Sequence, residues 1–247
     1  MIGLSPLEIS ALLAAALLVG FSKTAISGVS AISVALFASV LPARESTGAL
    51  LPLLLVGDVL AVRAYRRHTD WPVLLRLLPS VVVGVLVGAV FVAHVDDVVM
   101  RRTIGGFLLA MAVYHVWRRR RPTRADEPQR PHHGRAFVFG LLAGFTTMVA
   151  NAGGPAMSLY LLSSGFSMLG FLGTGAWFFF IVNLFKLPFS VALGLIDTQS
   201  LLRDAFLAVA VLAGAFIGRA CVHRIDQKLF ERLVLLFTVL ASINLLR

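Results

Sequence analysis

The sequence predicts an all-α polytopic membrane protein built from two inverted repeats of about five helical segments each. Of its 247 residues, 58% are hydrophobic and only 14% are charged, and the mean hydropathy is +0.89. Soluble domains average roughly 45–50% apolar and about 25% charged residues, so this composition excludes a soluble protein. Apolar runs separated by arginine clusters predict the helices, and motifs that recur in the two halves predict the repeat.

Ten apolar segments follow from dividing the chain at charge clusters, prolines and glycines. A spanning helix needs about 20 mostly apolar residues. Residues 5–8, Ser-Pro-Leu-Glu, have the pattern of a capping box with proline at the first helical position. Because no positive charge precedes this helix, we expect it to stay in the mature protein and not to be a cleaved signal. The segments run roughly over 6–21, 25–41, 46–64, 72–95, 97–117, 136–150, 155–165, 168–190, 200–222 and 227–246.

A basic stretch between the fifth and sixth segments, residues 118–135, separates the two halves. It contains seven arginines and three prolines and has no apolar face to bury, so we expect a solvated linker. The sequence therefore predicts a first transmembrane repeat over 1–117, a basic cytoplasmic linker over 118–135 and a second transmembrane repeat over 136–247.

Motifs of the first half recur in the second half at the same spacing, and we interpret them as a duplication. The glycine pairs among them are typical of close helix packing in membranes, either within one protomer or between the protomers of a homodimer. The matches are Gly84, Gly88, Asp96 and Arg102 with Gly214, Gly218, Asp226 and Arg232, Gly20-Phe21-Ser22 with Gly144-Phe145-Thr146, and Thr47-Gly48-Ala49 with Thr174-Gly175-Ala176.

The arginines indicate how the chain lies in the bilayer, because short cytoplasmic loops collect Lys and Arg. Basic loops follow the third and fifth segments and surround the turn between the ninth and tenth. All three basic loops can be cytoplasmic only if both termini are outside. This arrangement places equivalent turns of the two halves on opposite sides of the membrane. We expect a multi-pass protein of the cytoplasmic (inner) membrane. This distribution also explains the net charge of +10 without nucleic acid as a partner.

Inverted repeats are typical of alternating-access transporters, whose substrates bind near the middle of the membrane at discontinuous helices. We therefore expect a broken or re-entrant helix at the start of each repeat. The first segment is short and ends at a polar stretch, which predicts a break and candidate substrate contacts at Ser22, Lys23 and Thr24.

The second break lies between Thr146 and Pro155 and suits a small anionic substrate. A proline fits the first turn of a new helix, glycines allow close approach, and freed N–H groups at a helix start favour negative charge. Packing by the glycines alone is the competing interpretation. The candidate substrate-binding residues here are Thr146, Thr147, Asn151, Gly153, Gly154 and Pro155.

Few ionisable side chains lie within the apolar segments, and each has two interpretations. Lys186 ends fifty residues without a charge and either contributes positive potential to the pathway or reaches toward the headgroups. Lys23 has the same two interpretations. Asp58 is a candidate proton-coupling carboxylate, or else a hydrated aspartate or a partner of Arg63. Trp177 is a candidate gate, although bulk facing lipid or other helices is the commoner role.

Other classes of protein lack support in the sequence. The single Cys221 excludes a disulfide framework, and the scattered histidines imply no metal or other cofactor. Motifs of metal-dependent proteases and serine hydrolases are missing, so we expect no enzyme and no catalytic residues. A passive anion channel or uniporter remains the alternative to a coupled transporter.

One stretch of the second half is distinctive. It is Gly140-Leu-Leu-Ala-Gly-Phe-Thr-Thr-Met-Val-Ala-Asn-Ala-Gly-Gly-Pro155, and it is followed by Tyr160-Leu-Leu and Gly173-Thr-Gly. It resembles the sulfite exporter TauE/SafE family of membrane permeases, and the resemblance extends over essentially the whole chain. In the first half the sequence departs from the family's usual run of glycines, because Ser27-Gly28-Val29-Ser30 stands there.

This resemblance implies a secondary transporter for sulfite, an organosulfonate such as sulfoacetate, or another small organic anion, coupled to an ion gradient. Contacts of Ser22, Lys23 and Thr24 with substrate follow from the first break and not from the family pattern. Positions that the resemblance adds as substrate-binding candidates are Gly28, with Ser27 beside it, Thr47 and Thr174, and it also covers Asn151, Gly153, Gly154 and Pro155.

Overall fold

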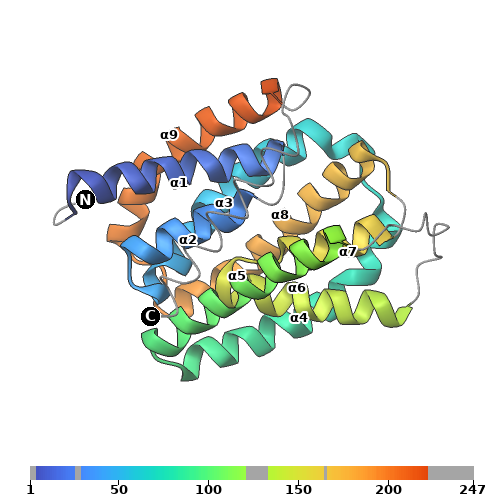
Figure 1. The fold of residues 1–247 in the computed structure, drawn as a ribbon, viewed down its shortest axis with the longest axis horizontal. Helices are drawn as coiled ribbons and strands as arrows, with labels where there is room; N and C mark the ends of the chain where they lie inside the picture. Colours follow the sequence, from blue (N-terminus) through green and yellow to red (C-terminus); the bar gives the residue numbers. More distant parts are fainter. Residues whose placement is uncertain (1–3, 26–28, 121–132, 164–165, 222–247) are drawn as a thin grey trace.

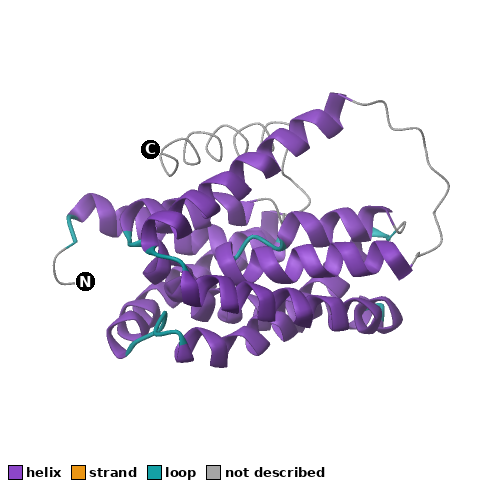
Figure 2. Cartoon of the chain, turned by 90° about the horizontal axis from the view of Figure 1, so that it is seen from below, coloured by secondary structure: helices purple, strands orange, loops and turns teal. Residues whose placement is uncertain are grey.

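The protein is helical throughout the part of the chain that the computed structural model describes, residues 4–25, 29–120, 133–163 and 166–221 (Figure 2). The expected all-α class is confirmed for these residues. The helices in these ranges are α1 (Pro6–Thr24), α2 (Ser30–Val40), α3 (Ala43–Tyr65), followed by the short 3-10 helix η2 (Arg66–His68), α4 (Trp71–His94), α5 (Asp97–Arg120), α6 (His133–Ala150), α7 (Gly154–Ser163), α8 (Met168–Ala192) and α9 (Thr198–Cys221) (Figure 1).

The start of α1 follows the capping pattern of the sequence. The Ser5 side chain accepts the Glu8 N–H, and the Glu8 carboxylate accepts the Ser5 N–H at 2.7 Å. The predicted capping box is thus confirmed. Two orphan donors of the first turn are satisfied in this way, so the helix can begin without help from tertiary contacts.

The end of α1 differs from the prediction. The helix continues through Ser22 and ends at Thr24, not at residue 21. Ser22 Oγ donates to the Val19 carbonyl at 2.8 Å, so this polar side chain is satisfied by its own helix and does not interrupt it. The expected break at residues 22–24 is therefore wrong by about one turn, and the next helix, α2, begins at Ser30.

Five of the described helices are long and apolar enough to cross a membrane: α1, α3, α4, α8 and α9. The predicted span 97–117 is not among them, although α5 has the length, because Asp97, Arg101 and Arg102 lie in its first turns. α2 and α6 contribute shorter apolar stretches. The predicted tenth segment, 227–246, and the matches at Asp226 and Arg232 lie outside the described residues.

Glycines bring two pairs of helices into close contact, α4 with α6 and α1 with α9 (Figure 1). At each of four glycines, an added Cβ would collide with a carbonyl of the facing helix. These glycines therefore serve packing within one protomer. The contacts are Gly84 with the Leu141 carbonyl, Gly144 with the Val81 carbonyl, Gly214 with the Leu17 carbonyl and Gly20 with the Val211 carbonyl.

The two contacts are built from matching positions of the two halves. In each pair, the first helix of one half packs on the fourth helix of the other half. In α1 and α6 the contacting carbonyl belongs to a leucine three residues before the glycine, Leu17 before Gly20 and Leu141 before Gly144. In α4 and α9 it belongs to a valine three residues before the glycine, Val81 before Gly84 and Val211 before Gly214.

Helices α3 and α8 pack against one another and run in opposite directions. Near the start of α3, Gly48 lies against the Leu195 carbonyl just after α8, and at its end the Tyr65 carbonyl lies against Gly173 near the start of α8. α3 carries Thr47-Gly48-Ala49 and α8 carries Thr174-Gly175-Ala176, so two helices with the same motif run in opposite directions. The polar residues of both helices meet where they cross.

Candidate functional site

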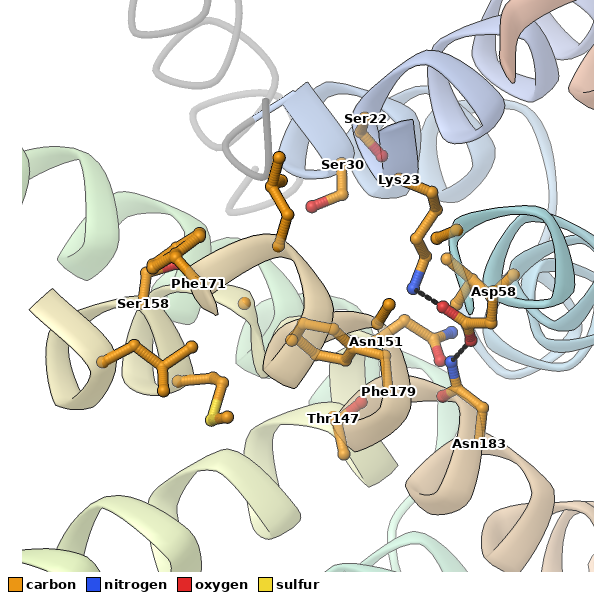
Figure 3. A pocket seen from close by; sticks show the side chains of 18 residues that line it. Ser22, Lys23, Ser30, Asp58, Thr147, Asn151, Ser158, Phe171, Phe179 and Asn183 are labelled. Carbon is orange, nitrogen blue, oxygen red and sulfur yellow. Dashed lines mark hydrogen bonds and ion pairs between the residues drawn. The ribbon is translucent and has the colours of Figure 1, made fainter. Parts of the chain in front are cut away.

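A buried ion pair joins α1 to α3 (Figure 3). Lys23 Nζ lies 2.6 Å from Asp58 Oδ1, and the Asp58 side chain is 0% exposed. The other carboxylate oxygen accepts a hydrogen bond from Asn183 Nδ2 of α8 at 2.7 Å. Lys23 also lies over the ring of Phe179, 4.5 Å from its centroid, which adds a cation–π contact. Asp58 therefore pairs with Lys23 inside the protein and not with Arg63, so the interpretation as a partner of Arg63 is wrong.

A second buried ammonium lies beside the first. Lys186 of α8 is 1% exposed, and its Nζ donates to the Thr147 carbonyl at 2.6 Å and to Asn151 Oδ1 at 2.7 Å. The interpretation that Lys186 reaches toward the headgroups is wrong, because the carbonyl oxygens at the end of α6 satisfy it inside the protein. Cations are favoured at a helix C-terminus, where the last carbonyls lack helical partners.

The predicted second break is present and centres on Asn151. α6 ends at Ala150, α7 begins at Gly154, and Asn151 has a φ of 50°. Asparagine is one of the few residues that adopt this left-handed conformation readily, often just after a helix. Its Nδ2 donates to the Thr47 carbonyl of α3 at 2.9 Å. One amide side chain thus connects the break to α3 through its nitrogen and to Lys186 through its oxygen.

A cavity of ≈ 50 Å³ lies between this break, the ion pair and the start of α8. Since one water needs about 10–15 Å³ of such space, the cavity holds a few waters or one compact ion. Polar groups line it together with apolar side chains, and Figure 3 shows Lys23 and Asp58 at one end and Ser158 and Phe171 at the other. The lining is Ser22, Lys23, Ser30, Leu54, Asp58, Ala61, Thr147, Asn151, Gly154, Met157, Ser158, Leu161, Phe171, Leu172, Gly175, Ala176, Phe179 and Asn183.

The buried network carries one more positive than negative charge. Counted by formal charge, Lys23 and Lys186 supply two ammonium groups, and Asp58 supplies one carboxylate, which pairs with Lys23. The N-terminus of α7, where Gly154 lines the cavity, adds positive potential from its unpaired N–H groups. Isolated charge is costly in a low-dielectric interior, so a site with one excess positive charge is stabilised by a monoanion.

The family model of the sulfite exporter TauE/SafE family matches residues 12–245, nearly the whole chain. The chain belongs to the sulfite exporter TauE/SafE family. It is accordingly a membrane protein of a transporter family. Comparisons with curated proteins and with solved structures found no match.

The cavity of this TauE/SafE member gathers some of the predicted substrate-binding residues. Ser22, Lys23, Thr147, Asn151 and Gly154 line it, together with the coupling candidate Asp58. Lys186 lies beneath the lining and contacts two of these residues. Pro155 lies in the first turn of α7, where the sequence placed it. Ser27 and Gly28 lie outside the described residues.

Other predicted residues have structural partners away from the cavity. Thr24 Oγ1 donates to the Ala215 carbonyl of α9 at 3.0 Å, and Thr146 Oγ1 donates to the Leu142 carbonyl of its own helix at 2.7 Å. Thr47 contributes its carbonyl to Asn151, as described above.

Three more predicted residues belong to helix packing. A Cβ at Gly153 would lie 2.8 Å from the Ala143 carbonyl, so this glycine lets the break lie against α6. Thr174 Oγ1 accepts the Asp70 N–H at 2.9 Å. Trp177, the gating candidate, packs against Trp71, with ring centroids 5.1 Å apart and the ring planes tilted by 50°.

Sequence reasoning missed Asn183, Phe179, Ser30 and Ser158. Asn183 carries a detectable signal, since it is an amide in an apolar helix three residues before Lys186 and therefore on the same face. The two serines and Phe179 carry no such signal, because serine and phenylalanine are common in membrane helices of any role.

Proposed function

We propose that this protein is a secondary transporter that moves a small oxyanion, such as sulfite or an organosulfonate, across the cytoplasmic membrane. The observation that carries the proposal is the excess positive charge of the buried Lys23, Asp58 and Lys186 network beside a cavity. A compact monoanion would complete the charge balance. Belonging to the sulfite exporter family supports this substrate class.

The cavity offers hydrogen-bond donors suited to an oxyanion. Lys23, Ser158 and the start of α7 at Gly154 all line it. At ≈ 50 Å³ the space accommodates a small inorganic oxyanion more readily than a long organic anion. We therefore expect sulfite to bind more tightly than sulfoacetate in the conformation seen here.

Coupling to protons follows from the position of Asp58. The Lys23 ammonium lies 2.6 Å from Asp58 Oδ1. An anion that approaches Lys23 therefore competes with the Asp58 carboxylate for this ammonium group. A carboxylate that loses its cation in a low-dielectric environment favours taking up a proton. In this scheme one proton joins Asp58 when the anion binds Lys23, and it leaves when the pair forms again.

We further propose that the two halves are inverted repeats with both termini outside. Equivalent helices α3 and α8 pack in opposite directions, and the α1–α9 and α4–α6 contacts use matching residues. Two halves related in this way can each adopt the conformation of the other, and this exchange is the basis of alternating access. The network lies where α1, α3, α6 and α8 meet, between the halves. A homodimer remains a prediction from the sequence.

The experiment that tests this function measures uptake of labelled sulfite and of a labelled sulfonate into proteoliposomes, with and without an imposed proton gradient. We compare the wild type with Lys186→Met, and Arg102→Gln serves as a matched control because Arg102 is exposed at the start of α5. Gradient-driven accumulation that Lys186→Met abolishes and Arg102→Gln retains supports a coupled carrier. Flux that only equilibrates indicates a channel or uniporter, and no flux of either anion contradicts this cargo.

A further inference from the structure

A second polar region lies about 20 Å from the ion pair along α3, since Glu45 and Asp58 are separated by 13 residues at about 1.5 Å each. Here the starts of α3, α5 and α9 surround an open depression of ≈ 370 Å³. We call it the Asp197 depression. Its charged and hydroxyl-bearing lining residues are Arg44, Glu45, Asp97, Asp197 and Ser200.

Asp204 lies below this depression and is not used by the anion site. Ser200 and Asp204 are spaced by four residues and share one face of α9, Asp197 immediately precedes this helix, and Asp204 lies one turn deeper than Ser200. Asp204 is 3% exposed, and neither of its carboxylate oxygens has a hydrogen-bond partner among the described residues. Buried polar groups are rarely left without a partner unless they serve a function.

The neighbouring arginines make no hydrogen bond to Asp204, although Arg203 acts on it electrostatically. Arg203 Nη1 pairs with Glu45 at 2.7 Å, while its Nε and Nη2 have no partner in the described ranges. Arg44 Nη1 donates to the Val92 and Val95 carbonyls at 2.6 and 3.0 Å. Of these two arginines, Arg203 pairs with another carboxylate of the region, and Arg44 bonds to carbonyls at the end of α4.

Acidic groups outnumber the basic ones around Asp204. Glu45 of α3 and Asp197, just before α9, act on Asp204 electrostatically, and Asp97 at the start of α5 lines the depression. The region holds four carboxylates and two guanidinium groups, so its formal charge is −2. The carboxylates are those of Glu45, Asp97, Asp197 and Asp204, and the guanidinium groups are those of Arg44 and Arg203. Such a mouth repels an anionic substrate and concentrates cations.

We propose that Asp204 is a proton-binding site loaded from the Asp197 depression, and that it supplies protons for coupled anion movement. The coupling role rests on the proposed function, in whose topology the depression opens on the outer side. The step is a simple transfer: hydronium in the depression gives one proton to the Asp204 carboxylate, which leaves water and a neutral carboxylic acid. A metal cation is disfavoured, because no group of three or more His, Cys, Asp or Glu side chains within the described ranges is arranged to hold one.

Carbodiimide labelling tests the site without relying on transport. Dicyclohexylcarbodiimide modifies carboxyl groups that are protonated in an apolar environment. The full chain in liposomes is treated at acidic and at alkaline pH, and modified residues are mapped by mass spectrometry. We expect Asp204 to be modified at acidic pH and protected at alkaline pH, whereas exposed Asp96 stays unmodified at both. No modification of Asp204 at acidic pH, or equal modification at both pH values, overturns the proposal.

A transport assay then tests the coupling role. Asp204→Asn should lower the ratio of internal to external sulfite under a proton gradient to the ratio measured without one, Asp204→Glu should restore accumulation, and Asp96→Asn should leave it unchanged. Full accumulation by Asp204→Asn contradicts the coupling role. Labelling of Asp204 in a wild type that moves no anion refutes the proposed function while the proton site stands.

Discussion

Lys186 Nζ lies 2.7 Å from Asn151 Oδ1, so a buried ammonium of α8 holds the amide that ends α6. The same amide donates to the Thr47 carbonyl of α3 at 2.9 Å. A change at the break therefore alters contacts with both α3 and α8. Because α3 carries Asp58, this amide also links the break to the helix of the ion pair.

The two lysines should respond differently to loss of charge. Lys23→Met leaves the Asp58 carboxylate buried without its cation, and breaking a buried pair costs about 3–5 kcal/mol. Lys186→Met removes an ammonium whose hydrogen-bond partners among the described residues are carbonyl, amide and hydroxyl oxygens and not a carboxylate, so the protein should remain more stable than Lys23→Met. Thermal unfolding in detergent, monitored by size-exclusion chromatography, measures this difference.

The double variant Lys23→Met with Asp58→Leu provides the control for that prediction. Removing both charges takes away the unpaired carboxylate, so we expect stability to recover relative to Lys23→Met alone. Transport should not recover, since the cavity has lost its ammonium. A double variant as unstable as the single one would show that the ion pair is not the source of the effect.

Asn151 combines a backbone role and a side-chain role, and substitution can separate them. Asn151→Gly keeps the left-handed conformation, because glycine adopts a φ of 50° without strain. It removes both amide hydrogen bonds and leaves Lys186 with fewer partners. We expect a folded protein whose sulfite uptake falls roughly 10- to 150-fold, consistent with the loss of a charge-assisted hydrogen bond of about 1.5–3 kcal/mol.

Asn151→Ala should be worse in stability than Asn151→Gly, because alanine adds strain at positive φ to the same loss of contacts. The difference between the unfolding temperatures of the two variants measures how much strain at this left-handed position lowers stability. Equal temperatures would mean that the left-handed conformation matters little for stability.

The sequence predicted the helices and the second break because both depend on local signals. Hydropathy, proline and glycine placed α6 and α7 to within a few residues, and the Ser5 capping pattern placed the start of α1. The end of α1 was misplaced because Ser22 bonds to its own helix, which composition does not reveal. For the same reason Thr24 and Thr146 were assigned to substrate, although their hydroxyls bond to carbonyls of neighbouring and local helices.

The ion pair could not be predicted, because Lys23 and Asp58 are 35 positions apart and meet only through tertiary packing. Each residue alone allowed a structural and a functional interpretation. Only the contact between them shows that both side chains lie inside the protein. Asn183 was within reach of sequence reasoning, since its spacing from Lys186 places both on one face of α8.

Matching glycines should be equally sensitive to added volume. A Cβ at Gly20 or Gly144 would collide with a carbonyl of the facing helix, so Gly20→Leu and Gly144→Leu should both prevent the helix pair from closing. Gly106 is the matched control, because nothing lies within 4 Å of its added Cβ, and Gly106→Ala should be neutral or slightly stabilising. The amount of monodisperse protein recovered in detergent distinguishes these cases, and tolerance at either Gly20 or Gly144 would contradict their packing role.

Accessibility from the two sides of the membrane tests the inverted arrangement. Cys221 is the only cysteine, so Cys221→Ser gives a background for single cysteines at Arg67 and Thr198. Both positions are exposed and flank the equivalent α3–α4 and α8–α9 turns. In inverted repeats these turns lie on opposite sides, so a membrane-impermeant maleimide applied to intact cells should label Thr198→Cys and spare Arg67→Cys until the cells are opened. Labelling of both positions, or of neither, from outside would place the turns on one side and exclude the inversion.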